Sequence, residues 1–245
     1  MATIYLSPST QEGNFYVTGG SEEFYMNKLA DALEPYLRAN AIDFKRNDPN
    51  QTVVSIIRES NAGNYALHLA LHSNAAPDAK YGTMRGIIAY YFPGSYSGKR
   101  AADIAVRRFK EIYPLPELVE ARPTTYLGEV DKVKAPSLFL EIGYHDNVDD
   151  AKWIENNIPL IAKTIAQSLA EYFGQPFVTP IQPQQATVTT SGSNLNLRAR
   201  PNSSSAVVGS IPRGAKVTVY GLLPDWASVQ YNGKSGFVAR RFLNI

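Results

Sequence analysis

The sequence predicts a large α/β domain, with a mostly parallel sheet and helices on both faces, followed by a small all-β barrel. Segments 66–71 and 137–140 are apolar with almost no polar break, as in strands buried on both faces. Helical stripes of apolar residues alternate with such segments up to about residue 175, which indicates strand–helix–strand units. Beyond residue 188, short strand-like segments are separated by turn residues, a pattern typical of a small barrel.

Composition excludes several classes of function. The chain has 245 residues, enough for two domains, and 24 basic against 22 acidic side chains give a net charge of +2. No basic run with interleaved aromatics occurs, so nucleic acid is not an expected partner. No stretch approaches the roughly 20 apolar residues that span a bilayer, so no membrane partner is expected. The absence of cysteine excludes disulfides, thiolate metal sites and a thiol nucleophile.

The first elements of the large domain are a strand at 4–6 and, after a polar loop, a helix. Ser21 is a suitable N-cap, and Glu22 and Glu23 lie in the first turn, where the helix dipole favours carboxylates. An apolar stripe from Met26 to Leu37 predicts the buried face of this helix. Pro35 interrupts the stripe and is expected to kink or shorten the helix.

The later elements of the large domain alternate between strands and helices. Pro159 is expected in the first turn of a long helix that closes the domain. A polar loop is expected before the strand that carries Glu141. In order, the sequence predicts a short strand at 42–44, a helix near 53–62, the strand ending at His72, a strand at 87–92, a helix from about 97, a strand at 138–141 and the long helix.

The domain boundary is expected where this periodicity ends. Residues 175–185 hold three prolines among glutamines and apolar residues, without periodicity, which favours a linker. Short strands follow at close spacing, with Asn232-Gly233 among the turn residues between them. The expected division is 1–175 for the large domain, 176–187 for the linker and 188–245 for the barrel.

The expected chemistry lies at the carboxyl ends of the central strands. His72 ends one buried strand, and ligands collect at such ends in open α/β sheets. A hydrogen-bonded core histidine is the alternative. Glu141 lies late in a second buried strand, where an unpaired carboxylate is costly and usually handles a cation or a proton. His68 lies about 13 Å from His72 along one strand, so the two cannot share a metal. The candidate site residues are Glu23, His68, His72, Glu141 and His145.

A zinc ion with three protein ligands and a water, next to a glutamate base, would form a peptide or amide hydrolase site. Three segments carry a more specific pattern: Glu23 with Asn27 four residues later, Leu71–Ala75, and Leu140–Tyr144 followed by Asn147. Together they resemble the zinc-dependent N-acetylmuramoyl-L-alanine amidases with a phosphorylase/hydrolase-like α/β fold, over about residues 1 to 175. The resemblance implies that Glu23 and His72 bind zinc and that Glu141 is the catalytic acid/base.

One departure from this family concerns the third zinc ligand. The family has a histidine in a loop directly after the first strand, whereas this chain has Ser7-Pro8-Ser9-Thr10-Gln11 there. Gln11 could supply a carbonyl oxygen and lies closer to the missing residue. His145 could supply a nitrogen, which suits zinc better than an amide does. Both remain candidates, and so does a site that has lost its metal.

The tail resembles the bacterial SH3-like cell-wall-binding domains. Its opening Leu195–Pro201 segment matches their first motif, and Trp226 with Tyr231–Val238 matches their closing strands. The tail therefore implies peptidoglycan as the partner. The alternative is that these aromatics and glycines only build the barrel.

The leading hypothesis is a peptidoglycan hydrolase, of the autolysin or endolysin kind, that cuts the amide between N-acetylmuramic acid and L-alanine. The tail would anchor it to the bacterial cell wall, outside the cell, although no signal peptide is visible at the start of the chain. A second hypothesis is a wall-binding protein whose amidase-like domain holds muropeptide without cutting it. A third is another zinc amidohydrolase or peptidase on the same fold.

Overall fold

The computed structural model describes residues 2–245, which form two compact units. The α/β unit comprises residues 3–33 and 44–172. The β-rich unit comprises residue 2, residues 34–43 and residues 173–245. Within residues 2–245, no helix is both long and apolar enough to cross a membrane.

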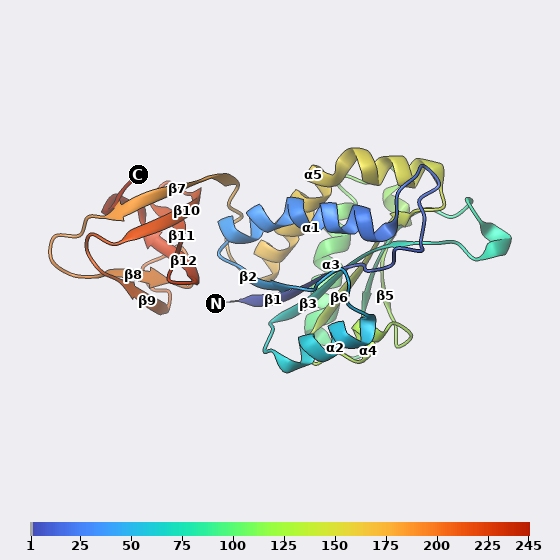
Figure 1. Cartoon of the computed structure of the whole chain (residues 1–245), viewed down its shortest axis with the longest axis horizontal. Coiled ribbons are helices and arrows are strands. Elements are labelled where there is room, and N and C mark those ends of the chain that lie inside the picture. Colours follow the sequence, from blue (N-terminus) through green and yellow to red (C-terminus); the bar gives the residue numbers. More distant parts are fainter. Residues whose placement is uncertain (1) are drawn as a thin grey trace. The chain divides into compact units, whose positions relative to one another are not determined.

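The α/β unit contains a six-stranded sheet in the order β2-β1-β3-β6-β4-β5 (Figure 1). The pairs β1–β3, β3–β6 and β4–β5 are parallel, and β4–β6 is antiparallel. The mostly parallel sheet is thus confirmed, and β1, β3 and β6 end at one edge. The strands are β1 (Thr3–Pro8), β2 (Asp43–Arg46), β3 (Leu67–Asn74), β4 (Ile87–Tyr91), β5 (Val119–Pro123) and β6 (Ser137–Tyr144).

Helices cover both faces of this sheet, as the sequence predicts. Figure 1 shows α1 and α5 on one side and α2 and α4 on the other, and α3 packs against α5. The helices are α1 (Glu22–Ala39), α2 (Val53–Ala62), α3 (Tyr96–Phe109), α4 (Gly128–Asp131) and α5 (Val148–Tyr172), with short 3-10 turns η1 (Asp78–Lys80) and η2 (Pro116–Leu118).

Helix α1 begins where the sequence predicts, because the Ser21 hydroxyl accepts a hydrogen bond from the Phe24 amide at 3.2 Å. The expected shortening at Pro35 does not occur, since α1 continues to Ala39. Pro35 is exposed, so water can reach the carbonyl that its missing N–H leaves unpaired. In α5 the backbone leaves helical geometry at Asn157, and Pro159 then lies in the first turn of the continuing helix, as expected.

Two elements occupy the stretch that was expected to be a polar loop before β6. Strand β5 adds an edge strand to the sheet, and α4 follows it directly before β6. Both elements are short, and α4 has only four residues, so neither produces a readable periodicity.

The β-rich unit holds a seven-stranded sheet in the order β13-β7-β10-β11-β12-β8-β9, whose resolved pairings are antiparallel. Asn232 and Gly233 have φ of 46° and 76°, the left-handed pair that a two-residue hairpin turn requires. The strands are β7 (Pro180–Val188), β8 (Leu195–Arg198), β9 (Val207–Ile211), β10 (Lys216–Leu222), β11 (Trp226–Tyr231), β12 (Lys234–Ala239) and β13 (Leu243–Asn244), with η3 (Arg240–Phe242) before the last strand.

Strand β7 occupies most of segment 176–187, which was expected to be a linker. It pairs with β10 from Lys216 to Gly221 and with β13 only near its end, at Thr187 and Val188. Its first part therefore has one unpaired side, where a proline without an N–H is tolerated. The prolines favoured a linker in the sequence analysis, but two of the three lie in a strand that has only one paired side over most of its length.

Residues 34–43 also belong to the β-rich unit. Ala39 and Ala41 are buried with Val178 and Phe237. The Asn40 side chain donates to the Val178 carbonyl at 2.9 Å and accepts from the Val178 amide at 2.9 Å. This unit therefore includes residues that lie far apart in the chain.

These pairings predict that the β-rich unit requires strand β7. Fragments 178–245 and 189–245 both lack residues 34–43, so a comparison of the two isolates the contribution of β7. Fragment 189–245 also leaves one side of β10 unpaired and loses buried Ala186 and Val188, so it should melt at a lower temperature or without a cooperative transition. Burial of those side chains contributes roughly 2–4 kcal/mol. Circular dichroism melts of the two fragments check this, and a cooperative transition of 189–245 at the temperature of the longer fragment would contradict it.

Candidate functional site

The candidate site lies at the edge where β1, β3 and β6 end together. His72 on β3 is directly in register with Glu141 on β6, so their side chains start from neighbouring positions on one face. Gly143 has φ of 73° two residues after Glu141, and the β3–β6 register shifts beside it. A left-handed glycine thus lets β6 turn away at this edge.

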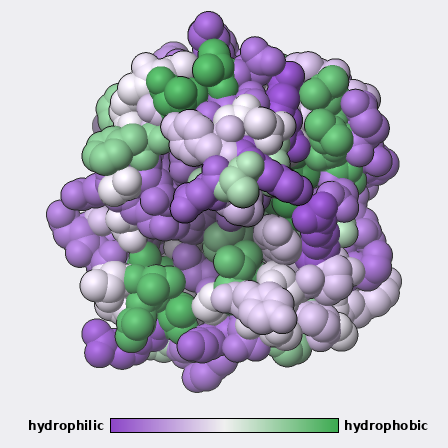
Figure 2. All heavy atoms as spheres, turned by 90° about the vertical axis from the view of Figure 1, so that its right-hand side faces the viewer, coloured by the Kyte–Doolittle hydropathy of each residue, from purple (hydrophilic) through white to green (hydrophobic). Residues whose placement is uncertain are grey.

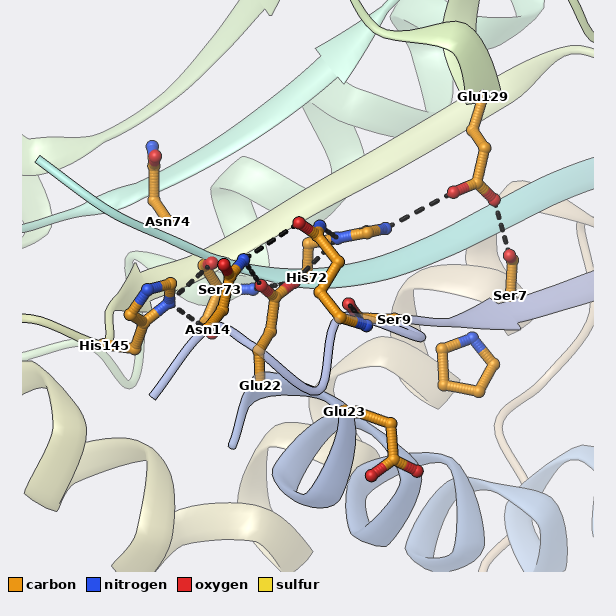
Figure 3. A network of polar contacts seen from close by, with 12 residues as sticks. Ser7, Ser9, Asn14, Glu22, Glu23, His72, Ser73, Asn74, Glu129 and His145 are labelled. Carbon is orange, nitrogen blue, oxygen red and sulfur yellow. Dashed lines mark hydrogen bonds and ion pairs between the residues drawn. The ribbon is translucent and has the colours of Figure 1, made fainter. Parts of the chain in front are cut away.

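The closest contact of the site joins Glu22 and His72. Glu22 Oε1 lies 2.7 Å from His72 Nδ1, and both residues are buried (Figure 3). Glu22 Oε2 accepts from the Asn14 amide at 2.7 Å, and the Ser73 backbone N–H approaches Oε1 at 3.4 Å. The first residue of α1, the loop after β1 and the end of β3 therefore converge on one carboxylate.

Glu22, and not the predicted ligand Glu23, is the glutamate that contacts His72. The Glu23 carboxylate accepts from the Asn27 side chain at 3.0 Å, and in Figure 3 it points away from His72. Successive helix residues are about 100° apart, so only one of the two glutamates can face the sheet. The signal was in the sequence: Glu22 lies four residues before Met26 and so shares the buried stripe of α1.

Of the two candidates for a third ligand, the structure brings only Gln11 to His72. Gln11 Nε2 lies 3.4 Å from His72 Nδ1, and its Oε1 accepts from Asn14 at 2.9 Å. His145 instead turns its Nδ1 toward the Ser73 carbonyl at 2.9 Å. Its ring stacks on Tyr16 with centroids 5.6 Å apart. Among residues 2–245, no contact joins His145 to Glu22 or His72.

A second carboxylate, Glu129 of α4, lies on the other side of the His72 ring and was missed by the sequence analysis. Its Oε2 is 3.4 Å from His72 Nε2, and its Oε1 is 3.0 Å from His68 Nε2. Ser7 at the end of β1 donates to the same Oε1 at 2.5 Å. His68 is the core histidine of the strand, with Nδ1 2.9 Å from the Ser60 hydroxyl. Nothing in the pattern around Glu129 marked it as buried.

The two carboxylates set the charge of His72. Burial disfavours the charged ring, but the hydrogen bonds and charges of Glu129 and Glu22 outweigh it and raise the pKa of His72 to about 10. In return, although burial opposes ionisation, His72 holds the pKa of Glu22 and, together with His68, that of Glu129 below the usual range. The site is an imidazolium between two carboxylates when no cation is bound.

Glu141 has the opposite electrostatic character. Its Oε2 is buried and finds no hydrogen-bond partner among the described residues. Burial raises the pKa of Glu141 to about 8; the charge of His72 opposes this shift and that of Glu22 adds to it. The other titratable groups that couple to it are Tyr90 and Tyr144. A carboxyl group with this pKa can accept and return a proton near neutral pH.

Glu22 and His72 are side chains of the two kinds that bind metal ions well, a carboxylate and an imidazole. In the described part of the chain, no group of three or more histidine, aspartate or glutamate side chains is arranged to hold a metal ion. A cation at Glu22 and His72 would therefore take its third protein ligand from a neutral group, and the Gln11 amide is the one at hand.

The surface around this edge is mixed. Figure 2 views the molecule from the side of the loops that follow β1 and β3, and its apolar side chains form separate patches among polar ones. Two aromatic side chains of these loops are exposed, Phe15 at 71% and Tyr81 at 62%. They provide apolar surface beside the site without forming one continuous apolar face.

The fold is an α/β unit with a mostly parallel sheet together with an antiparallel β-rich unit. Its site places a carboxylate–imidazole pair beside a second carboxyl group, one oxygen of which has no hydrogen-bond partner within the described chain. A family model described as N-acetylmuramoyl-L-alanine amidase matches residues 8–171, and one described as bacterial SH3 domain matches residues 193–244. The chain belongs to the N-acetylmuramoyl-L-alanine amidase family. These matches confirm the amidase and SH3-like resemblances, and they agree with a peptidoglycan amidase that has a wall-binding tail.

Solved structures agree with the fold. The N-acetylmuramoyl-L-alanine amidase AmiC2 of Nostoc punctiforme is similar with a TM-score of 0.62 at 14% identity, over 71% of this chain and 98% of that one. The catalytic domain of CwlV, an amidase from Bacillus (Paenibacillus) polymyxa var. colistinus, gives 0.61 at 16%, over 71% and 98%. The catalytic domain of the CD27L endolysin, which targets Clostridia difficile, gives 0.58 at 17%, over 70% and 98%. No curated protein sequence matches.

The raised pKa of Glu141 predicts how stability depends on pH in the metal-free protein. Folding favours the neutral carboxyl group, so the wild type loses stability as pH rises from 4.5 through about 8. Glutamine does not ionise, so Glu141→Gln should not show this loss. Its free energy of unfolding relative to the wild type should rise by about 1–3 kcal/mol between pH 5 and pH 9. Urea unfolding at several pH values measures the free energy of unfolding of both proteins. A difference between them that does not change with pH would contradict the raised pKa of Glu141.

Proposed function

We propose that this protein is a zinc-dependent amidase that hydrolyses the bond between the lactyl carbonyl of N-acetylmuramic acid and L-alanine. The observation that carries the proposal is Glu141 Oε2, buried without a partner among residues 2–245, beside the Glu22–His72 pair. A carboxylate left unpaired in such a place is costly unless it handles a proton in the reaction.

The residues present fit one zinc ion. Glu22 and His72 are a carboxylate and an imidazole, both ordinary zinc ligands, and a zinc ion bound by both would replace the proton of the 2.7 Å hydrogen bond that now joins them. Gln11 has its amide 3.4 Å from the same ring nitrogen. Rotation of that amide by 180° would turn its carbonyl oxygen toward the ligand position, at the cost of the hydrogen bond that this oxygen accepts from Asn14. Of the predicted metal residues, the proposal keeps His72 and Gln11, replaces Glu23 with Glu22 and sets His145 aside.

The chain's own groups then divide the reaction between them. A bound zinc ion would polarise the scissile carbonyl and acidify the attacking water. Glu141 accepts the proton of that water as its oxygen bonds to the carbonyl carbon. It returns the proton to the alanine nitrogen as the C–N bond breaks. The products are a lactyl carboxylate on the sugar and a free α-amine on the peptide.

The β-rich unit supports the substrate assignment. A bacterial SH3 domain at residues 193–244 is expected to keep the enzyme on peptidoglycan, so the site of action is the bacterial cell wall. An anchored enzyme gains effective concentration at its polymer without any new contact at the active site.

The alternative is a wall-binding protein that holds muropeptide without cutting it. The observation that favours it is the loop after the first strand, which lacks the family's histidine and brings the neutral amide of Gln11 to His72. An amide oxygen binds zinc more weakly than an imidazole does, so a site of this kind can lose its metal.

Digestion of purified sacculi tests the proposal against this alternative. The wild type with zinc should release new amino termini that belong to L-alanine, and Glu141→Gln should lower the rate at least ~100-fold while keeping its zinc. Sacculi bound by the wild type without new amino termini, at any zinc concentration, would support the binding protein instead.

A pair of variants tests which residue is the third zinc ligand. Gln11→Ala should weaken zinc binding, because it removes the donor nearest to His72 Nδ1. His145→Ala should keep the zinc, because that ring is turned to Ser73. Zinc content after dialysis, measured by atomic emission, separates the two. Loss of zinc in His145→Ala with retention in Gln11→Ala would reverse the assignment.

A further inference from the structure

We infer that Glu129 is a positioning residue that fixes the tautomer and the orientation of His72. This inference rests on the proposed function, since it concerns His72 as a metal ligand. Figure 3 shows Glu22 and Glu129 approaching the His72 ring from different elements, the start of α1 and the short helix α4.

The two ring nitrogens of His72 face different groups. Nδ1 lies 2.7 Å from Glu22 Oε1 and 3.4 Å from the Gln11 amide, so the proposed ligands surround this nitrogen. Nε2 lies 3.4 Å from Glu129 Oε2. A carboxylate can only accept, so in the metal-free site both ring nitrogens carry a proton, Nδ1 toward Glu22 and Nε2 toward Glu129. When a cation takes the place of the Nδ1 proton, Glu129 keeps the remaining proton on Nε2, and the Nδ1 lone pair is free for the cation.

The ring is also held against rotation. It stacks on Phe139 of β6, with centroids 4.3 Å apart and planes 13° from parallel. Exchanging the two nitrogens would require the ring to turn within this stack. Phe139 thus sets the plane of the His72 ring, and Glu129 sets which nitrogen points to which side.

Glu129 is itself fixed by groups that take no part in the ligand set. Its Oε1 accepts from Ser7 at 2.5 Å and lies 3.0 Å from His68 Nε2. Because a carboxylate only accepts, His68 Nε2 presents an N–H to Glu129, and the Ser60 hydroxyl can donate to the other nitrogen of His68 at 2.9 Å. With 4% of its surface exposed, the carboxylate has a defined place from which to act on His72.

This support has a particular use in a site with a weak third ligand. Carboxylate partners of ligating histidines raise the basicity of the ring and orient it, and their loss typically costs 10–100-fold in metal affinity. Glu129 supplies this to His72, the only imidazole beside Glu22 among residues 2–245. The contribution strengthens the one nitrogen ligand of the set.

Zinc binding and the protonation of His72 test the inference. The variants are Glu129→Gln, which keeps the shape but offers one acceptor oxygen to three donors, and Glu129→Ala. Asp131→Asn on the same helix α4 is the control, because it removes an exposed carboxylate. Zinc affinity is measured by competition with a chromophoric chelator. Long-range ¹H–¹⁵N spectra report the protonation of each ring nitrogen, and the chain has only 3 histidines to assign.

We expect about 10-fold weaker zinc binding in Glu129→Gln and up to ~100-fold in Glu129→Ala, with faster solvent exchange of the His72 Nε2 proton in both. Asp131→Asn should match the wild type. If Glu129→Ala does not fold, Glu129→Gln decides alone. Wild-type affinity together with a protected Nε2 proton in Glu129→Gln would overturn the inference. A wild type that binds no zinc would count against the proposed function, while exchange of the Nε2 proton in the metal-free protein still decides the role of Glu129.

Discussion

The contact between Glu22 and His72 is the constraint on which the rest of the site depends. Two buried groups of opposite charge lie 2.7 Å apart, and each would be costly alone in that position. The contact requires the first residue of α1 to reach the end of β3, so it fixes where the helix begins. It also fixes the loop after β1, since Asn14 and Gln11 complete the surroundings of the same two groups. Glu141 lies beside the pair because β3 and β6 are parallel and in register.

The proposed zinc site would depend on its surroundings. The amidase family has a histidine in the loop after the first strand, whereas the loop Ser7–Gln11 of this chain has none, and the proposed replacement Gln11 is a weaker donor for zinc. Glu129, held by Ser7 and His68, supports the remaining imidazole from the far side. The same α4 that carries Glu129 leads into β6, so the strand that bears Glu141 and the support of His72 are connected along the chain.

Much of this was readable from the sequence, and the failures have physical reasons. The apolar segments that end in His72 and Glu141 are strands buried on both faces, so their ends had to form the functional edge. The sequence analysis named Glu23, whereas the structure brings Glu22 to His72, because Glu22 lies on the buried stripe of α1 that contains Met26. Glu129 could not be found, since its burial depends on contacts with β1 and β3, far away in the sequence. Strand β7 was hidden because its prolines lie where it has an unpaired side.

The central claim is that Glu22, and not its neighbour, forms the site with His72. The most direct measurement compares the zinc content of two matched variants, Glu22→Gln and Glu23→Gln, which remove one charge each from adjacent positions of α1. The account predicts that Glu22→Gln loses zinc. Glu23→Gln should retain zinc at the wild-type level, because the Glu23 carboxylate accepts a hydrogen bond from Asn27 and does not contact His72. Loss of zinc in Glu23→Gln with retention in Glu22→Gln would contradict the account.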